Sequence, residues 1–161
     1  QAHNKIMEFP KIKISSKLVR CIFIGSAGMF AGMGSTLSLA AVPAMLASTD
    51  PIPTWKVIYQ RGKTIAIITV LTSSVAALHL LYKKGDLRYL ACAALNLSVI
   101  PYTLKFMKPT NNALLALKRA KPDEIGKEEK NLIVTWGGLQ WVRTVLGIST
   151  LAIGLHAVFY K

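Results

Sequence analysis

The chain has 161 residues and carries 20 Lys and Arg against 7 Asp and Glu, a formal charge of +13. Hydrophobic residues make up 52% of it and charged residues only 17%, which excludes a disordered basic tail and disfavours a nucleic-acid-binding module, whose cations are spread over a polar surface. The two cysteines, Cys21 and Cys92, are spaced neither as a disulfide framework nor as metal ligands. We therefore expect no nucleic-acid partner and no metal site.

Residues 1–18 form a basic segment at the start of the chain. The segment includes Ser15 and Ser16, contains one acid, Glu8, and begins at Gln1 instead of a methionine. It resembles what remains of a chain after import into an organelle. This pattern favours an organellar membrane, with the mitochondrial inner membrane as the first candidate.

Four tracts that are nearly free of charge decide the fold class. They are residues 21–49, 64–82, 89–104 and 131–160, the last interrupted only by Arg143. A helix needs about 20 apolar residues to cross a bilayer, and no tract shows the repeating polar face of a soluble bundle helix. We predict one all-α domain over residues 1–161, an integral membrane four-helix bundle with both termini on the same side. The predicted spans are about 19–46, 63–82, 87–107 and 132–160.

The segment after the first span contains turn and interface signals. In the first span, Gly28 and Gly32 form a small-xxx-small pair that predicts close helix packing, and Pro43 is expected to end or kink this helix. Beyond a proline-rich stop, Trp55 and Tyr59 are four residues apart. Aromatic rings favour the headgroup layer, so we predict a short interfacial helix there.

Basic residues flank the predicted spans on both sides, so their count gives no membrane orientation. Four of them are expected to contact anionic lipid headgroups, although a merely solvated rim fits equally well: Lys83, Lys84, Lys105 and Lys108. Residues 108–131 are predicted to form a polar connection. Within it, Thr110 or Asn111 can cap a helix that begins at about Asn112.

The last predicted span contains one charged residue, Arg143, in an otherwise uncharged tract. An arginine in lipid costs roughly 2.5 to 3.5 kcal/mol on insertion scales, so Arg143 is expected to face the bundle interior or a polar cavity. Trp136 and Gln140 share its helical face. Because no acid lies in any predicted span, carbonyls, polar side chains or an anionic ligand such as an enolate or a carboxylate must neutralise it.

Several segments together are similar to a known family. They are Val42–Ala44 after a glycine-rich helix, Trp55 with Tyr59 and Gly62, Pro101–Thr103, Met107–Leu115, and Trp136 seven residues before Arg143. Over about residues 25–150 the chain resembles the small four-helix membrane proteins that include the fungal anthrone oxygenases. The resemblance implies oxidation of an aromatic polyketide-like or quinol-like substrate by molecular oxygen without a cofactor.

Such a reaction requires a base, an oxyanion stabiliser and a dry pocket. We assign oxyanion stabilisation to Arg143 and the base to His79, the only imidazole well inside a predicted span. The expected substrate contacts are Trp136, Gln140, Asn111, Asn112 and Tyr102. For Asn111, helix capping remains an equally good interpretation.

Two other functions remain open. The chain can be a non-catalytic accessory subunit that packs against other membrane subunits, or against copies of itself, in an organellar complex. Transport fits less well, since there is one arginine and no acid relay in the spans. A bundle interior with Arg143 bonded to backbone carbonyls is expected of an accessory subunit, whereas an apolar pocket bordered by Arg143, Trp136 and Asn111 is expected of an oxygenase.

Overall fold

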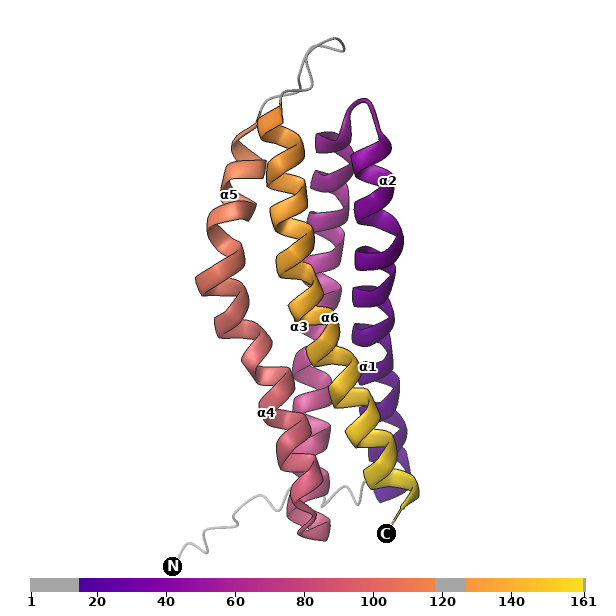
Figure 1. Ribbon diagram of the computed structural model, residues 1–161. Helices are drawn as coiled ribbons and strands as arrows, with labels where there is room; N and C mark the ends of the chain where they lie inside the picture. Colours follow the sequence, from indigo (N-terminus) through magenta and orange to yellow (C-terminus); the bar gives the residue numbers. More distant parts are fainter. Residues whose placement is uncertain (1–14, 118–126, 161) are drawn as a thin grey trace, which may run out of the picture.

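The computed structural model describes residues 15–117 and 127–160, and every element in this part of the chain is helical. The elements are α1 (Ser16–Thr36), the π-helical turn η1 (Leu37–Ala41), α2 (Val42–Ala47), α3 (Pro51–Lys84), α4 (Leu87–Tyr102), a second π-helical turn η2 (Thr103–Met107), α5 (Lys108–Ala116) and α6 (Lys127–Phe159). Because η1 joins α1 to α2 and η2 joins α4 to α5, the described residues form four long rods (Figure 1).

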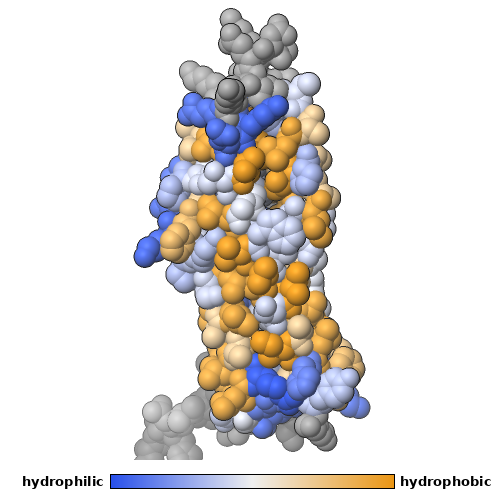
Figure 2. Space-filling model, in the orientation of Figure 1, coloured by the Kyte–Doolittle hydropathy of each residue, from blue (hydrophilic) through white to orange (hydrophobic). Residues whose placement is uncertain are grey.

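The rods pack as a closed ring in which α1 and α4 each contact both α3 and α6. Each rod is long and apolar enough to cross a membrane. Apolar side chains such as Ile68, Val75 and Val145 are more than half exposed, and apolar surface dominates the middle of the molecule between hydrophilic ends (Figure 2). The predicted all-α membrane bundle is confirmed for the described residues.

The end of the bundle that carries the α3–α4 turn, the lower end in Figure 1, is closely packed. Gly85 ends α3 with a φ of 68°, a conformation that glycine adopts without a steric penalty. Asp86 then caps α4 by accepting from the Arg88 amide at 3.0 Å. The Arg88 side chain hydrogen-bonds the same carboxylate, which lowers the pKa of Asp86, and also contacts His156 of α6 at 2.9 Å. These bonds join the turn to the end of α6.

The prediction of a separate interfacial helix is wrong. Its residues form the first turns of α3, which runs without interruption from Pro51 to Lys84. A proline in the first turn of a helix is tolerated because the amide it lacks has no intrahelical partner there. Trp55 is fully buried, stacked on Tyr59 at 4.9 Å and edge-on to Trp136 at 5.9 Å between ring centroids. The aromatic pair therefore belongs to the core.

The connection predicted over residues 108–131 is partly helical. Residues 108–116 form α5, which continues the α4 rod, while residues 118–126 lie outside the described part, as do residues 1–14 of the basic segment. Asn111 is inside α5 and caps no helix, because the chain enters α5 directly from η2. Pro43 and Pro109 do not end their rods either; each lies just after a π-helical turn.

The close helix approach predicted at Gly28 and Gly32 occurs elsewhere. A methyl group at Gly32 would meet no atom within 4 Å, and one at Gly28 would make an ordinary contact with Leu151. The tight positions are in α6: a methyl carbon would lie 2.8 Å from Val42 at Gly137, 2.9 Å from Phe30 at Gly147 and 2.6 Å from the Phe23 ring at Gly154. Phe23 is fully buried against Tyr89, so it has little room to move.

We expect Gly154→Ala to destabilise the bundle by about 1–3 kcal/mol, the usual effect of overpacking a close contact. Gly138→Ala in the same helix is the matched control, because its added methyl group meets nothing within 4 Å. Reversible unfolding in mixed detergent micelles measures both. Equal stability of the two variants would contradict the packing described for Phe23 and Gly154.

Candidate functional site

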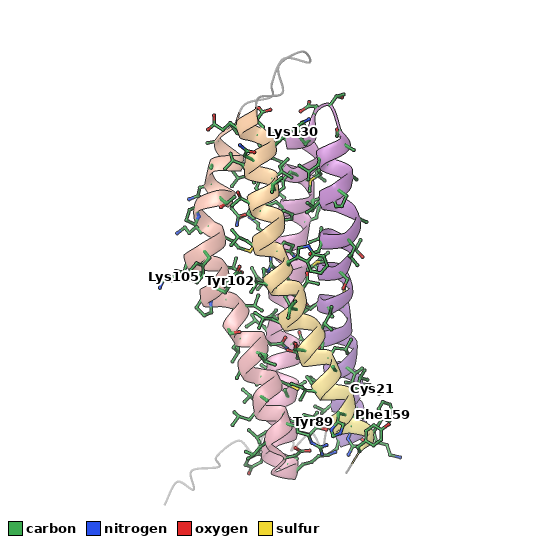
Figure 3. The ribbon with its side chains drawn as sticks, viewed as in Figure 1. Cys21, Tyr89, Tyr102, Lys105, Lys130 and Phe159 are labelled. Carbon is green, nitrogen blue, oxygen red and sulfur yellow. The ribbon has the colours of Figure 1, made fainter. Side chains whose placement is uncertain are left out.

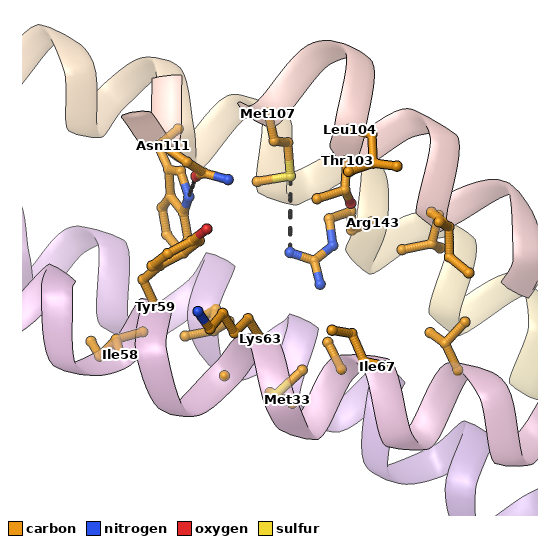
Figure 4. Close-up of a pocket in the computed structure, with 17 residues that line it drawn as sticks. Met33, Ile58, Tyr59, Lys63, Ile67, Thr103, Leu104, Met107, Asn111 and Arg143 are labelled. Carbon is orange, nitrogen blue, oxygen red and sulfur yellow. Dashed lines mark hydrogen bonds between the residues drawn. The ribbon is translucent and has the colours of Figure 1, made fainter. Parts of the chain in front are cut away.

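A cavity of about 260 Å³ lies in the upper half of the bundle, between α3 on one side and α4, η2 and α5 on the other (Figure 4). Most of its wall is made of aliphatic and methionine side chains. Six lining residues carry a polar or charged group: Tyr59, Lys63, Thr103, Asn111, Trp136 and Arg143. The combination of an apolar wall with a few converging polar groups is typical of a ligand site.

The two π-helical turns explain why the rods separate here. Val42 donates to the Leu37 carbonyl and Lys108 to the Thr103 carbonyl, so each turn closes on the residue immediately before a proline. Proline has no amide hydrogen and its ring clashes with the preceding turn; the wider turn accommodates both effects, and such turns are frequent at functional sites. Below η2, α3 packs closely on α4, whereas above η2 it makes few contacts with α5 (Figure 1). The cavity lies at this separation.

Arg143 enters the cavity from α6 without a counter-charge. Its Nη1 donates to Gln140 Oε1 at 3.1 Å and lies 3.9 Å from Met107 Sδ. The guanidinium carbon is 5.8 Å from the centre of the Phe30 ring, and the buried Nε has no acceptor. Among the described residues the recorded ion pair is Arg88 with Asp86. The guanidinium therefore keeps unused donor capacity directed at an apolar space.

Trp136 and Asn111 form the upper wall. The indole Nε1 donates to Asn111 Oδ1 at 3.0 Å, and both residues are buried. The indole is held further by the edge-on contact with Trp55, which Tyr59 covers. Since the hydrogen bond and the ring contact restrain different parts of the indole, the wall is rigid.

Sequence reasoning missed Lys63 and Tyr59 as cavity residues. Both lie on the stripe of α3 that faces the cavity, with Ala66, Ile67 and Val70. Spacings of four, seven and eight residues place them on one helical face, a signal visible once residues 51–84 are taken as one helix. Lys63 Nζ lies 5.6 Å from the centre of the Tyr59 ring, and Figure 4 shows Lys63 and Arg143 directed into the same space from opposite walls.

The structure brings three of the proposed site residues to the cavity wall: Arg143, Trp136 and Asn111. Gln140 lies behind the wall and orients Arg143 through their hydrogen bond. Asn112, the neighbour of Asn111, is exposed and points away from the bundle interior. The proposed contact at Tyr102 is not at the wall either, because its hydroxyl donates to the Leu139 carbonyl at 3.2 Å.

His79 does not reach the cavity. It follows the last α3 residue of the wall, Val70, by nine positions, about 14 Å along the helix. Its Nε2 is buried and has no hydrogen-bond partner among the described residues. The geometry therefore does not connect this imidazole with the chemistry of Arg143.

Comparison with known proteins finds a family match that includes most of the cavity-lining residues, all but Met33 and Leu37. Residues 55–153 match the family model described as anthrone oxygenase. An anthrone oxygenase of Cryptosporiopsis sp. is 30% identical over 96% of this chain and 94% of its own length. One of Claviceps purpurea is 26% identical, covering 87% and 88%, and one of Aspergillus fumigatus is 26% identical, covering 89% and 94%. No solved structure matches significantly.

We expect Asn111→Ala to destabilise the protein by about 1–3 kcal/mol, because it leaves the buried Trp136 Nε1 without an acceptor. Asn112→Ala removes the same side chain from the exposed neighbouring position and is expected to change stability by less than about 0.5 kcal/mol. Thermal unfolding followed by tryptophan fluorescence measures both. An unchanged midpoint for Asn111→Ala would show that the hydrogen bond does not hold the indole.

Proposed function

This chain belongs to the anthrone oxygenase family, and from that premise we propose that it oxidises a flat, phenolic aromatic of the anthrone class with molecular oxygen in the cavity of Figure 4. The observation that carries the proposal is the placement of two cations, Arg143 and Lys63, on an apolar wall that includes no acid among the described residues lining it. Such a wall favours an uncharged ring system that becomes an anion during the reaction.

The proposed reaction balances with the substrate and molecular oxygen as its only reactants. Loss of one proton from the methylene of an anthrone leaves an enolate whose charge lies mainly on the carbonyl oxygen. The electron-rich methine carbon then forms a bond to oxygen, and protonation gives a hydroperoxide. Loss of water from that hydroperoxide forms the second carbonyl, so one oxygen atom enters the product and the other leaves in water.

The cavity residues suit the anionic step. The unused donors of Arg143 are available to the developing oxyanion, and Lys63 provides a second positive charge across the cavity. Trp136 presents a fixed aromatic surface. At about 260 Å³ the space lies near the lower limit of ligand pockets, roughly 300–1,000 Å³, which suits a small rigid ring system.

Removal of the methylene proton is favoured because the cavity stabilises the enolate that it leaves. Among the described residues lining the cavity there is no carboxylate and no imidazole, so His79 is not retained as the base. Positive charge near a weak acid favours its ionised form. We propose that Arg143 and Lys63 make the bound methylene more acidic, and that the proton leaves to water at the cavity mouth.

The accessory-subunit hypothesis predicts different partners for Arg143 inside the bundle. One observation expected of an accessory subunit is an Arg143 that is satisfied by backbone carbonyls in a filled bundle. The recorded partners are instead the Gln140 side chain and the Met107 sulfur, beside an open cavity. After extraction in mild detergent, an accessory subunit is also expected to remain part of a larger assembly. The oxygenase is instead expected to be active when purified alone, without added metal or flavin.

We expect Arg143→Leu to lower kcat for anthrone oxidation at least 10²–10³-fold, the usual effect of removing one oxyanion-stabilising donor. Membrane insertion is expected to be retained, because the substitution removes the charge that is costly in lipid. Oxygen uptake and quinone absorbance in reconstituted vesicles measure turnover. Lys130→Gln, which removes an exposed cation away from the cavity, is the matched control. Equal turnover of the two variants would remove Arg143 from the reaction.

We also expect Lys63→Met to lower turnover, since the long apolar side chain keeps the volume and removes the second charge. If Lys63 acts only through its charge, Lys63→Arg is expected to restore most of the activity. Loss of activity in both variants would show that the Lys63 side chain contributes more than its charge. Full activity of Lys63→Met would contradict its proposed role.

A further inference from the structure

The cations on the α3 and α4 sides of the bundle lie in two separate tiers. The lower tier is at the α3–α4 turn and includes Lys83, Lys84 and Arg88. The second tier includes Lys63 and Lys105, and Figure 3 shows Lys105 about halfway up the molecule, pointing outward. Residues 64–82 and 89–104 between the tiers carry no charge.

The spacing of the tiers matches a bilayer. Twenty residues of α3 separate Lys63 from Lys83, and seventeen residues separate Arg88 from Lys105, which correspond to about 30 Å and about 26 Å of helix. The hydrocarbon core of a bilayer is about 30 Å thick. The two tiers are therefore separated by the distance between two headgroup layers.

The rods continue well past the second tier. From Lys63 to Pro51 in α3 and from Lys105 to Ala116 in α5, they extend about another 16–18 Å. These turns carry the exposed cations Arg61 and Lys108 and the half-buried Lys56, whose Nζ donates to the Leu117 carbonyl at 2.6 Å. A charged extension of that length does not fit within the hydrocarbon.

The cavity lies at the level of the second tier and opens sideways. Buried residues form its floor, whereas its rim is made of exposed apolar side chains of α3 and of the α4–η2 segment, namely Ile67, Ile100 and Leu104, together with Lys63. An exposed rim of aliphatic side chains is favourable against lipid. The Arg143 guanidinium also belongs to this level, because it reaches Met107 in η2.

We propose that the hydrocarbon core covers the bundle only between the two tiers, so that the cavity mouth between Leu104 and Ile67 opens into the membrane at headgroup depth. A flat aromatic with phenolic groups collects at that depth, since its rings are apolar and its hydroxyls are polar. Its entry from lipid through the apolar rim would bring its polar edge to Lys63 and Arg143. The identity of this ligand rests on the proposed function, whereas the depth and direction of the mouth do not.

Nitroxide depth measurements test the placement without any turnover. Single cysteines are introduced at Leu97, Leu104 and Asn112, three exposed sites along one rod, in a chain with Cys21→Ser and Cys92→Ser. Each labelled full-length protein is reconstituted in phosphatidylcholine vesicles. Collision of the label with oxygen and with a water-soluble nickel chelate is then measured by power saturation.

The proposal predicts a different membrane depth for the label at each of the three sites. The label at Leu97 is expected to be deepest, the label at Leu104 about 10 Å shallower but still reached mainly by oxygen, and the label at Asn112 reached mainly by the nickel chelate. Burial of Asn112 in lipid, equal depth at Leu97 and Leu104, or a Leu104 site reached mainly by the chelate would each overturn it. Failure of anthrone oxidation would leave these depths unchanged, so the two proposals can be told apart.

A mouth variant tests the route of entry. Leu104→Phe narrows the rim, and Leu97→Phe places the same ring on the lipid-facing surface below it. Quenching of the Trp55–Trp136 pair by a phenolic anthraquinone dissolved in the vesicles reports binding, in chains that also carry Trp141→Phe. We expect at least tenfold slower quenching for Leu104→Phe alone. Equal quenching rates in the two variants would show that the ligand does not enter between Leu104 and Ile67.

Discussion

The Arg143 guanidinium enters an apolar bundle and has no carboxylate partner among the described residues. Burying an unpaired charge is strongly unfavourable, so the surroundings of this one group restrict how the upper half of the molecule is built. Gln140 supplies one oxygen, Met107 a polarisable sulfur and Phe30 the face of a ring. None of these partners neutralises the charge, which is why the proposed function pairs it with an anion that forms in the cavity.

The lower and upper halves of the bundle are packed by different kinds of side chain. In the lower half, small residues such as Ala77 and Ala93 and the close approach at Gly154 let the helices touch. In the upper half, the turns η1 and η2 redirect the rods, and large aromatic rings fill part of the space. The remaining volume is the cavity. Both halves contain close approaches, at Gly154 in the lower half and at Gly137 in the upper half, so the two π-helical turns are what distinguishes the half with the cavity.

Buried polar groups without partners occur both at the cavity and away from it. Below the cavity, Ser73 donates to the Thr69 carbonyl and accepts from Asn96 at 2.6 Å, whereas Asn96 Oδ1, Ser74 Oγ and His79 Nε2 have no partner among the described residues. At the cavity, Thr103 Oγ1 and Arg143 Nε are also buried without partners. A buried polar group without a partner is unfavourable unless a ligand or water completes it. Thr103 and Arg143 line the cavity, where a bound ligand would complete them.

The helical membrane fold, the inward direction of Arg143 and its shared face with Trp136 followed from the sequence alone, because each depends on charge-free length or on helical spacing within one segment. The aromatic pair Trp55 and Tyr59 shows the limit of such reasoning: its spacing equally suits a membrane interface, and only its contact with Trp136 identifies it as core. His79 was assigned to the site and Lys63 was missed for a related reason. Which face of α3 meets the cavity depends on how four rods lean against one another, and tertiary packing alone decides that.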